Sequence, residues 1–412
     1  MSPDAAMLAL VFDAVKDGWD SSTGFRKASV PRPRLDERAD PEDASRVIVR
    51  VRYAGVCGSD RGIWYRSSFK GMILDSLLDE GKTCRVIGHE LVGAIAEVGT
   101  RARSRFELRE GQIVAAESHI VCGRCTQCRL GESHVCSNEK IIGISTDGCF
   151  AEYIKLPANV VWPTDPTKIR IEVAGIQEPF GNAVHACTKV DLRGRTVAIF
   201  GCGTIGLFTV LISRALGAAR VFGVEPNPRN REMAMTLGAD HVFAPSPPKA
   251  GGGAAADAAP GGAARAADAP DGASWRADEC VVAALHDATG GVGLDVAIEM
   301  AGENSSLNSA IASTRRGGDV VLFGIKSADF TIQSFDRVIV NGLTLHSVIG
   351  RQIFRTWYLT RGLLEDRANR IQDRVFDVIL EGGKGSIVAA RDFEPTLFEK
   401  KMLEHTKLLI EF

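Results

Sequence analysis

The sequence predicts an α/β protein in which a doubly wound parallel sheet is joined to a second, β-rich domain. Its 412 residues are enough for two domains. Between residues 190 and 341, buried-type strands alternate with helical stretches, which is the pattern of a parallel sheet covered by helices. The first 160 residues instead contain short β-like runs that Gly and Asp interrupt.

The β-rich part begins with residues 47–52, where apolar and polar side chains alternate as in a half-buried strand. Residues 92–98 and 112–116 are further candidate strands. Between them, residues 67–82 carry apolar side chains at near-helical spacing, which predicts a short amphipathic helix.

The parallel-sheet part starts with the apolar strand 195–200. Helices and strands then follow in turn: helix 207–216, strand 221–225, helix 229–237, strand 241–243, strand 295–299, helix 305–313 and strand 319–323. This alternation predicts a Rossmann domain over residues 190–341.

These patterns set the expected domain boundaries. We place the first domain at residues 1–189, with a metal lobe at 117–140, and expect residues 342–412 to return to it. Within the Rossmann domain, residues 245–273 are almost wholly Ala, Gly and Pro with a few charges. Because such a segment cannot bury a core, we expect a disordered surface insertion there.

Composition narrows the possible partners and the compartment. The net charge of −2 gives no electrostatic reason to expect nucleic acid or an anionic membrane as a partner. No apolar run is long enough to span a bilayer, and residues 1–11 lack the pattern of a signal peptide. Single cysteines scattered beside a metal-type cluster fit a reducing compartment, so we expect a cytoplasmic protein.

The metal-type cluster consists of four cysteines with the spacing C-x2-C-x2-C-x7-C, at Cys122, Cys125, Cys128 and Cys136. Four thiolates close a tetrahedral site, which is typical of structural zinc. Disulfide bonds are the alternative interpretation of the same four residues.

A nucleotide site is predicted by the pattern G-x-G-x-x-G at Gly201, Gly203 and Gly206. The pattern follows a strand, opens a helix, and precedes an acidic residue, Glu225, at the end of the next strand, which is the context of a dinucleotide fingerprint. The alternative is a glycine turn that binds no nucleotide.

Glu225 also bears on the choice of nucleotide. Its carboxylate would accept hydrogen bonds from the ribose hydroxyls and repel a 2′-phosphate, which favours NAD over NADP. Arg229 and Arg231 lie close by in the sequence and leave NADP open.

A second, reactive metal site is predicted from Cys57, His89 and Glu90, with Glu178 as a further oxygen ligand. A thiolate, an imidazole and a carboxylate that leave one position open are typical of catalytic zinc. Such a zinc acts as a Lewis acid on a substrate hydroxyl. The alternative is that Cys57 belongs to the core, His89 caps a turn and the glutamates are solvated.

With these motifs in place, the chain resembles the zinc-dependent medium-chain dehydrogenases/reductases over residues 45–385, apart from its insertions. Within that family it is most similar to the L-threonine 3-dehydrogenases. The likeness is carried by residues 118–123 (SHIVCG), 148–153 (GCFAEY), 178–185 (EPFGNAVH) and 350–358 (GRQIFRTWY).

The resemblance implies a catalytic domain with a chaperonin-10-like β-barrel, two zinc ions per chain, and a homodimer or homotetramer. It implies that Ser59 passes on the substrate proton and that His119 lines the substrate pocket. The implied cofactor contacts are Thr204, Ile205, Glu225 and Phe323, Gly324 and Ile325, with Gly350 and Arg351 near the same pocket.

The implied reaction is the zinc-dependent, NAD-linked oxidation of a secondary alcohol, with L-threonine as the leading small-molecule substrate. Two residues depart from the family pattern: Gly62 replaces the histidine of the proton relay, and Glu178 replaces an aspartate. A polyol or sugar dehydrogenase therefore stays open, as does a non-catalytic regulatory protein that binds zinc and nucleotide.

Overall fold

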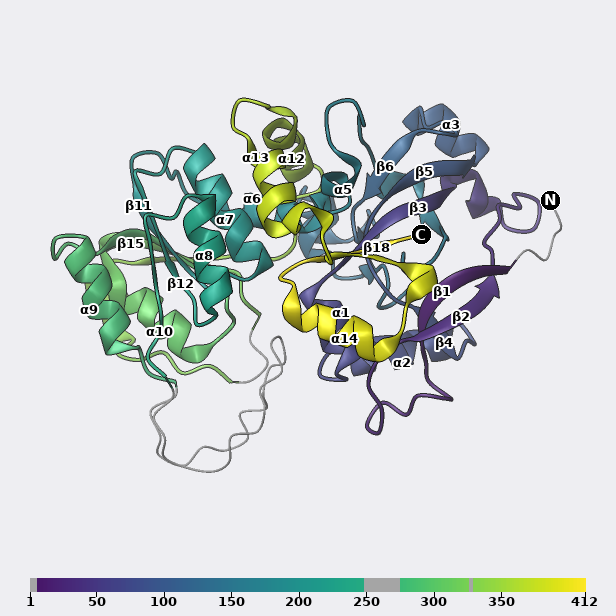
Figure 1. Cartoon of the computed structure of the whole chain (residues 1–412). Coiled ribbons are helices and arrows are strands. Elements are labelled where there is room, and N and C mark those ends of the chain that lie inside the picture. Colours follow the sequence, from purple (N-terminus) through teal and green to yellow (C-terminus); the bar gives the residue numbers. More distant parts are fainter. Residues whose placement is uncertain (1–5, 248–274, 326–328) are drawn as a thin grey trace. The chain divides into compact units, whose positions relative to one another are not determined.

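A computed structural model describes residues 6–247, 275–325 and 329–412 (Figure 1). The chain divides into two compact units. Unit 1 comprises Met1–Pro179 and Leu380–Phe412, and unit 2 comprises the described residues from Phe180 to Ile379. Apart from residues 245–247, the expected insertion at 245–273 lies outside the described residues.

The main sheet of unit 1 has the strand order β10-β6-β5-β3-β18-β17, and β9 also pairs with β3. The strands are β3 (Arg46–Val56), β5 (Glu90–Val98), β6 (Ile113–Ala116), β9 (Tyr153–Pro157), β10 (Val161–Pro163), β17 (Ile387–Ala389) and β18 (Leu408–Glu411). The three predicted strands are confirmed. β3 is longer than predicted and ends at Val56. Its last four residues are all buried, so they do not show the alternation of apolar and polar side chains from which the strand was predicted.

Two smaller sheets and several helices complete unit 1. One sheet has the order β2-β1-β4 and the other pairs β7 with β8. Their strands are β1 (Ala6–Asp13), β2 (Arg26–Pro31), β4 (Cys84–Val86), β7 (His119–Ile120) and β8 (Lys140–Ile141). The helices are α1 (Gly58–Trp64), α2 (Lys70–Asp79), α3 (Thr100–Phe106), α4 (Thr126–Arg129), α5 (Ile171–Ala174) and α14 (Pro395–Glu404).

Packing in the core of unit 1 holds helices α1, α2 and α14 in place. The predicted amphipathic helix is α2, which buries Ile73 and Leu77. Trp64 at the end of α1 is almost fully buried, and its ring lies 5.1 Å from Phe25 and 5.4 Å from Phe398 of α14. Aromatic contacts of this kind hold α14, and therefore the segment that follows it, against α1.

Unit 2 contains the predicted parallel sheet, with strand order β13-β12-β11-β14-β15-β16. Its strands are β11 (Thr196–Phe200), β12 (Arg220–Val224), β13 (His241–Phe243), β14 (Leu294–Glu299), β15 (Thr314–Leu322) and β16 (Thr344–Ser347). Its helices include α7 (Thr204–Ala215), α8 (Pro228–Leu237), α9 (Glu279–Ala288), α10 (Asn304–Ser313), α11 (Asp336–Val340), α12 (Arg355–Glu365) and α13 (Ile371–Arg374). Helix α6 (Gln177–Cys187) crosses the boundary between the units. The Rossmann-type alternation is confirmed.

The structure corrects the expected return of the chain at residue 342. β16 adds a sixth strand to the sheet by pairing in parallel with β15, and the π-helical turn Val375–Ile379 packs against α7 and α8. The chain therefore re-enters unit 1 only at Leu380. β16 is an edge strand with no buried residue, so it lacks the apolar run that would have revealed it.

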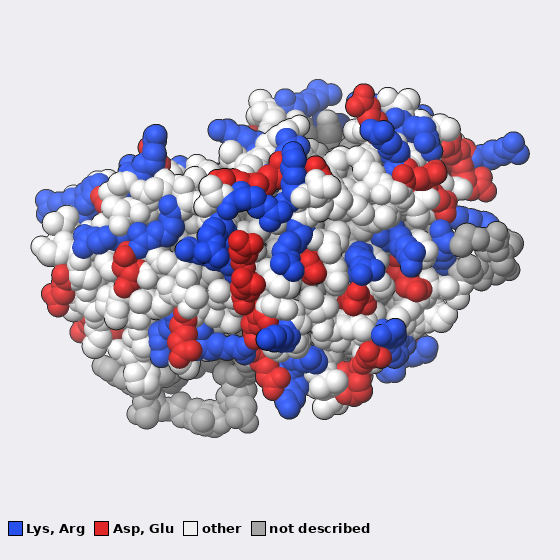
Figure 2. All heavy atoms as spheres, turned by 45° about the horizontal axis from the view of Figure 1, so that its top comes forward, with Lys and Arg blue, Asp and Glu red and all other residues white. Residues whose placement is uncertain are grey.

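The described surface carries charges of both signs. On the face that Figure 2 shows, Lys and Arg side chains are interspersed with Asp and Glu side chains, in keeping with a net charge of −2. Among the helices of the described ranges, none is both long enough and apolar enough to cross a bilayer.

Candidate metal and nucleotide sites

The predicted catalytic ligands meet in unit 1. Cys57 follows β3 directly and precedes α1, while His89 and Glu90 stand at the start of β5. One ligand atom from each of the three residues lies within 4.8 Å of the others. The Oε1 atom of Glu90 is buried without a hydrogen-bond partner. This donor set, with an unsatisfied buried oxygen, suits a zinc ion.

Asp60 supports this cluster from α1. Its side chain is fully buried, its Oδ2 accepts a hydrogen bond from Cys57 N at 2.8 Å, and its Oδ1 lies 3.6 Å from His89 Nδ1. A carboxylate behind a ligating histidine orients the ring. Burial alone would lower the pKa of His89, but Asp60 and Cys57 raise that pKa well above its usual value. The cluster therefore attracts positive charge.

Lys407 holds the second oxygen of Glu90. Its Nζ donates to Glu90 Oε2 and, at 3.0 Å, to the carbonyl oxygen of Val56. Gly55, which faces Glu90 across β3 and β5, leaves room for this contact, since a Cβ atom there would lie 2.0 Å from Glu90 Oε2. Burial raises the pKa of Glu90, against the lowering effect of Lys407. Glu90 thus presents one free oxygen and one bound oxygen.

Ser59 and Glu178 lie beside the three ligands. The Ser59 hydroxyl is 3.4 Å from His89 Nε2. Glu178 stands in α6, and its charge contributes to the pKa shifts of His89 and Glu90. Its Oε1 accepts a hydrogen bond from Ser118 Oγ at 2.7 Å, and it does not belong to the three-residue ligand group. The structure therefore places Glu178 next to the predicted metal site, with its carboxylate turned toward Ser118.

His119 forms its own pair, on β7. Its Nδ1 lies 2.7 Å from Glu139 Oε2, and its backbone N–H donates to Glu117 Oε1 at 3.1 Å. These bonds hold the ring through β7 and the start of β8 rather than through the metal cluster. The neighbouring residue, Ser118, is the link between His119 and Glu178.

The four clustered cysteines form a second group whose sulfur atoms lie within 4.8 Å of one another. All four are free thiols, and Cys125 Sγ and Cys136 Sγ are 3.8 Å apart, so the disulfide interpretation is not realised. Backbone N–H groups point at the sulfurs, for example Cys125 N at 3.4 Å from Cys122 Sγ. The lobe has the geometry of a closed tetrathiolate site.

The thiols of this lobe differ in acidity. Backbone N–H groups of Arg124 and Cys125 lower the pKa of Cys122 to about 6. Burial and the neighbouring thiols raise the pKa of Cys128 to about 12. A divalent cation held by these four residues would stabilise all of them as thiolates, so its binding would release protons.

The glycine fingerprint lies in unit 2, between β11 and α7, as predicted. Gly201 has φ of +95°, which only glycine adopts at low cost. A Cβ atom on Gly206 would lie 2.0 Å from Gly201 O, so this residue allows α7 to pack on the turn. A Cβ atom on Gly203 would meet nothing within 4 Å, which leaves open space where a pyrophosphate approaches the backbone.

Glu225 lies at the end of β12 and touches this turn. It accepts hydrogen bonds from Cys202 N at 2.7 Å and from Asn227 N at 2.8 Å, one on each oxygen. Burial raises its pKa, against these hydrogen bonds. Arg231 donates to the carbonyl oxygens of Glu225 and Pro226 at 3.0 and 2.6 Å. The Asn230 side chain also hydrogen-bonds to Glu225.

The remaining predicted contacts also lie in unit 2. The backbone N–H groups of Phe323 and Gly324, past the end of β15, donate to Glu299 O at 3.0 Å, and Ile325 is exposed. Arg351 is buried and donates to Asn182 Oδ1 at 2.7 Å. Thr204 and Ile205 open α7.

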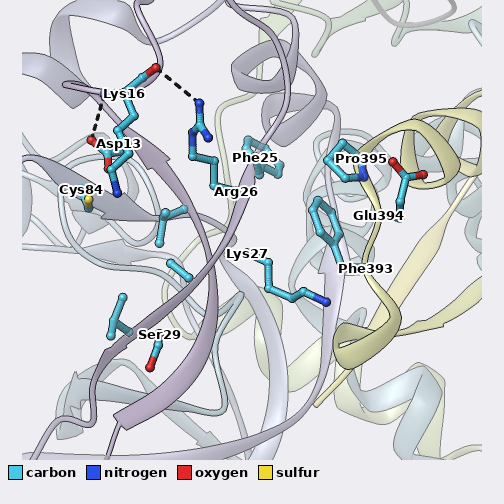
Figure 3. A pocket seen from close by; sticks show the side chains of 13 residues that line it. Asp13, Lys16, Phe25, Arg26, Lys27, Ser29, Cys84, Phe393, Glu394 and Pro395 are labelled. Carbon is cyan, nitrogen blue, oxygen red and sulfur yellow. Dashed lines mark hydrogen bonds and ion pairs between the residues drawn. The ribbon is translucent and has the colours of Figure 1, made fainter.

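A separate hollow in unit 1 does not involve any predicted site residue. It has a volume of about 610 Å³ and lies beside β2 and the start of α14 (Figure 3). Its three cations are already engaged, since Lys16 pairs with Asp13, Arg26 pairs with Asp17, and Lys27 donates to a backbone carbonyl at 2.8 Å. Two of the three cations are therefore neutralised by aspartates.

Comparison with known proteins agrees with this geometry. Residues 43–166 match the alcohol dehydrogenase GroES-like domain, and residues 204–365 match the zinc-binding dehydrogenase family. The chain is 32% identical over 362 residues to an L-threonine 3-dehydrogenase from Caldanaerobacter subterraneus, covering 88% of both chains. It is 32% identical over 341 residues to the Bacillus subtilis L-threonine 3-dehydrogenase, covering 82% of this chain and 83% of the relative.

A solved structure supports the same fold. An alcohol dehydrogenase from Thermotoga maritima superimposes with a TM-score of 0.74 at 20% identity, covering 99% of each chain. The chain therefore belongs to the zinc-dependent alcohol dehydrogenases, oxidoreductases that act on the CH–OH group of an alcohol and use a nicotinamide nucleotide. The predicted family, the chaperonin-10-like catalytic domain and the enzyme class are confirmed, and this membership favours an enzyme over the regulatory alternative.

Three residues that contact the predicted site residues were not themselves predicted from the sequence. Asp60 supports His89, Lys407 holds Glu90, and Glu139 holds His119. Asp60 stands in the same short motif as Cys57 and could have been found there. Lys407 carries no comparable signal, since it is separated from Glu90 by 317 residues.

Proposed function

We propose that the chain catalyses the NAD-linked oxidation of L-threonine, or of a closely related β-hydroxy compound, to the ketone. The observation that carries the proposal is the group of Cys57, His89 and Glu90, which fits an open zinc site in a chain of this family. The substrate is supported by the two relatives described above, both of which are L-threonine 3-dehydrogenases.

In this proposal each chain binds two zinc ions. Cys57, His89 and Glu90 hold the catalytic ion, with Glu178 beside it, and the four cysteines of the lobe hold the structural ion. When bound, the catalytic ion lowers the pKa of the substrate hydroxyl, and NAD accepts the hydride from the carbinol carbon. Lys407 and Asp60 keep Glu90 and His89 in position.

The proton of the substrate hydroxyl leaves through residues of unit 1. The Ser59 hydroxyl, 3.4 Å from His89 Nε2, is the first carrier. Gly62 cannot carry a proton, so the next acceptor is water, the ribose of the cofactor, or another group such as His119. The Glu139 carboxylate favours the His119 tautomer with its proton on Nδ1, which leaves Nε2 as an acceptor.

The nucleotide in this proposal is NAD and not NADP. Gly201, Gly203 and Gly206 receive the pyrophosphate, together with the first residues of α7. Glu225 binds the ribose hydroxyls and repels a 2′-phosphate. We also infer a cytoplasmic homodimer or homotetramer, from the unpaired thiols and the family resemblance.

The direct test is NADH formation by the zinc-loaded protein with L-threonine, sorbitol, glucose, threitol and 2,3-butanediol. Preference for L-threonine supports the proposal. Preference for a polyol or sugar would overturn the substrate and keep the reaction type. Elemental analysis should find two zinc ions per chain, and one ion alone would contradict the catalytic metal site.

Cys57→Ser tests the metal site itself. The loss of Lewis-acid catalysis is worth several kcal/mol, so kcat/KM should fall by roughly 10³-fold or more, because each tenfold corresponds to about 1.4 kcal/mol. Zinc content should fall from two ions to one while NADH binding is unchanged. Cys280→Ser, an exposed thiol of α9, is the matched control. Full turnover by Cys57→Ser would remove this residue from the mechanism.

A further inference from the structure

Arg61 is a cation beside the candidate metal centre. It stands on α1, four residues after Cys57, which is the N-cap of that helix. Its backbone N–H donates to Cys57 O at 3.1 Å. The charges of Cys57 and Asp60 both act on its guanidinium group.

The guanidinium of Arg61 forms few of the hydrogen bonds that it could donate. A guanidinium has five N–H donors, and here one hydrogen bond of the side chain is formed, from Nη2 to His405 O at 2.9 Å. Among the residues that the structure describes, no carboxylate lies within ion-pair distance of it. The side chain is nevertheless partly buried, and burial lowers the pKa of Arg61. A desolvated cation without a counter-ion is costly.

Other partly or fully buried arginines of unit 1 are satisfied. Arg46 binds two aspartates, at 2.6 and 2.7 Å, and Arg85 binds Glu80 and Asp147, both at 3.1 Å. Arg66 has no carboxylate partner but donates to three carbonyl oxygens and a hydroxyl. Arg61 differs from all three, since most of its N–H donors have no acceptor among the described residues and are available to a ligand.

The neighbouring charged groups are engaged with other partners. Lys407, the other cation of the region, is already bound to Glu90 and Val56 O. Glu381, which could approach from the same segment, accepts from His405 Nδ1 at 2.9 Å. The Trp64–Phe398 contact keeps α1 against α14, so the carbonyl of His405 holds the guanidinium in one place.

We propose that Arg61 binds an anionic group of a reactant, a carboxylate or a phosphate, next to the catalytic centre. The inference rests on the proposed function, because L-threonine supplies a carboxylate and the nucleotide supplies a pyrophosphate. A guanidinium suits both groups, since its fork binds two oxygens at once. The competing interpretation is purely structural, in which Arg61 only ties α1 to the segment after α14.

The test compares Arg61→Met, which removes the charge, with Arg61→Lys, which keeps a charge but not the fork. Arg101→Met, an exposed arginine of α3, is the control. Three quantities are measured: the dissociation constant of NADH by fluorescence, KM for L-threonine, and KM for the uncharged 2,3-butanediol. A hydrogen bond to a charged group implies a loss of about 10- to 100-fold in Arg61→Met. Arg61→Lys should lose less.

The pattern of losses identifies the anion. If the carboxylate of the substrate is bound, KM for L-threonine rises while NADH binding and KM for 2,3-butanediol are unchanged. If the phosphate of the nucleotide is bound, the NADH dissociation constant rises whichever alcohol is used. Lower thermal stability with unchanged NADH binding and unchanged KM would overturn the inference in favour of the structural interpretation.

Failure of the proposed function is a different result, because it appears in the wild-type protein. A wild type that does not oxidise L-threonine contradicts the proposed substrate. The NADH dissociation constant then decides the inference about Arg61 alone, and an unchanged value in both variants overturns it. If Arg61→Met does not fold, Arg61→Gln also removes the charge and takes its place in the comparison.

Discussion

The buried pair between Lys407 and Glu90 gives a sharp prediction about stability. The exposed fractions of the two side chains are 2% and 0%. Lys407→Met keeps the apolar stem and removes the ammonium group, which leaves the Glu90 carboxylate without a counter-charge and Val56 O without a donor. Breaking a buried pair from one side costs about 3–5 kcal/mol, and an orphaned carbonyl adds about 1 kcal/mol.

The loss of stability in Lys407→Met should depend on pH, because Glu90 can become neutral by taking up a proton. Burial raises the pKa of Glu90, and Lys407 is the strongest of the charges that lower it. Without Lys407 the pKa rises further, so the native variant binds a proton that the unfolded chain releases. The variant therefore loses stability as pH rises from the ordinary Glu value, about 4.3, toward the raised value. Near neutral pH we expect a loss of about 4–6 kcal/mol.

A double-mutant cycle with Glu90→Gln isolates the pair. Glu90→Gln combined with Lys407→Met removes both charges, so it should recover about 2 kcal/mol of the single-variant loss. Urea unfolding is measured in EDTA, which takes metal ligation by Glu90 out of the comparison. The control is Lys401→Met, because within the described residues Lys401 donates to Gly385 O, at 3.0 Å, and to no carboxylate. A loss below about 1 kcal/mol in Lys407→Met, equal to that of the control, would refute the reasoning.

Two further predictions concern other parts of the chain. Gly206→Ala would place a Cβ atom 2.0 Å from Gly201 O, so we expect a loss of about 1–3 kcal/mol and weaker NADH binding, whereas Gly362→Ala, with open space around its Cβ, should bind NADH normally. Burial alone would raise the pKa of Asp43, but its ion pair with Lys155, at 2.7 Å, and its hydrogen bonds lower it. Its stabilising effect is thus present above about pH 3.9 and is lost as pH falls through the lowered pKa. Thermal midpoints of Asp43→Asn and wild type should converge in acid, and a gap independent of pH would contradict this.

Much of unit 2 could be predicted because its signals are local. The strand, the glycine turn and the helix from Thr196 to Ala215 follow one another without interruption, and each carries its own pattern. The edge strand β16 could not be predicted in this way, since its position depends on pairing with β15 and not on an apolar run. The hairpin of β1 and β2 was missed for a related reason: the exposed residues of β2 give no core-facing pattern.

In the candidate site, too, residues in local motifs could be predicted and residues brought in by long-range pairing could not. Cys57, His89 and Glu90 could be predicted, because the chemistry of metal ligation restricts residue type and each lies in a short motif. The residues that hold them in place could not all be predicted. Lys407 reaches Glu90 only because β18 pairs with β3, and His119 meets Glu139 only because β7 pairs with β8. Such contacts are products of long-range strand pairing, for which a single sequence gives no spacing rule.

The position of β18 has a consequence for how the protein is made on the ribosome. β18 lies between β3 and β17 in the main sheet of unit 1, yet it follows the whole of unit 2 in the sequence. During synthesis, β3 and its neighbours emerge first, and residues 53–56 of β3 must wait with one edge unpaired until residues 408–411 arrive. An open edge of this kind is prone to pair with other chains. Unit 2 can complete its sheet earlier, so the candidate metal centre, where Lys407 pairs with Glu90, is the last part of the enzyme to form.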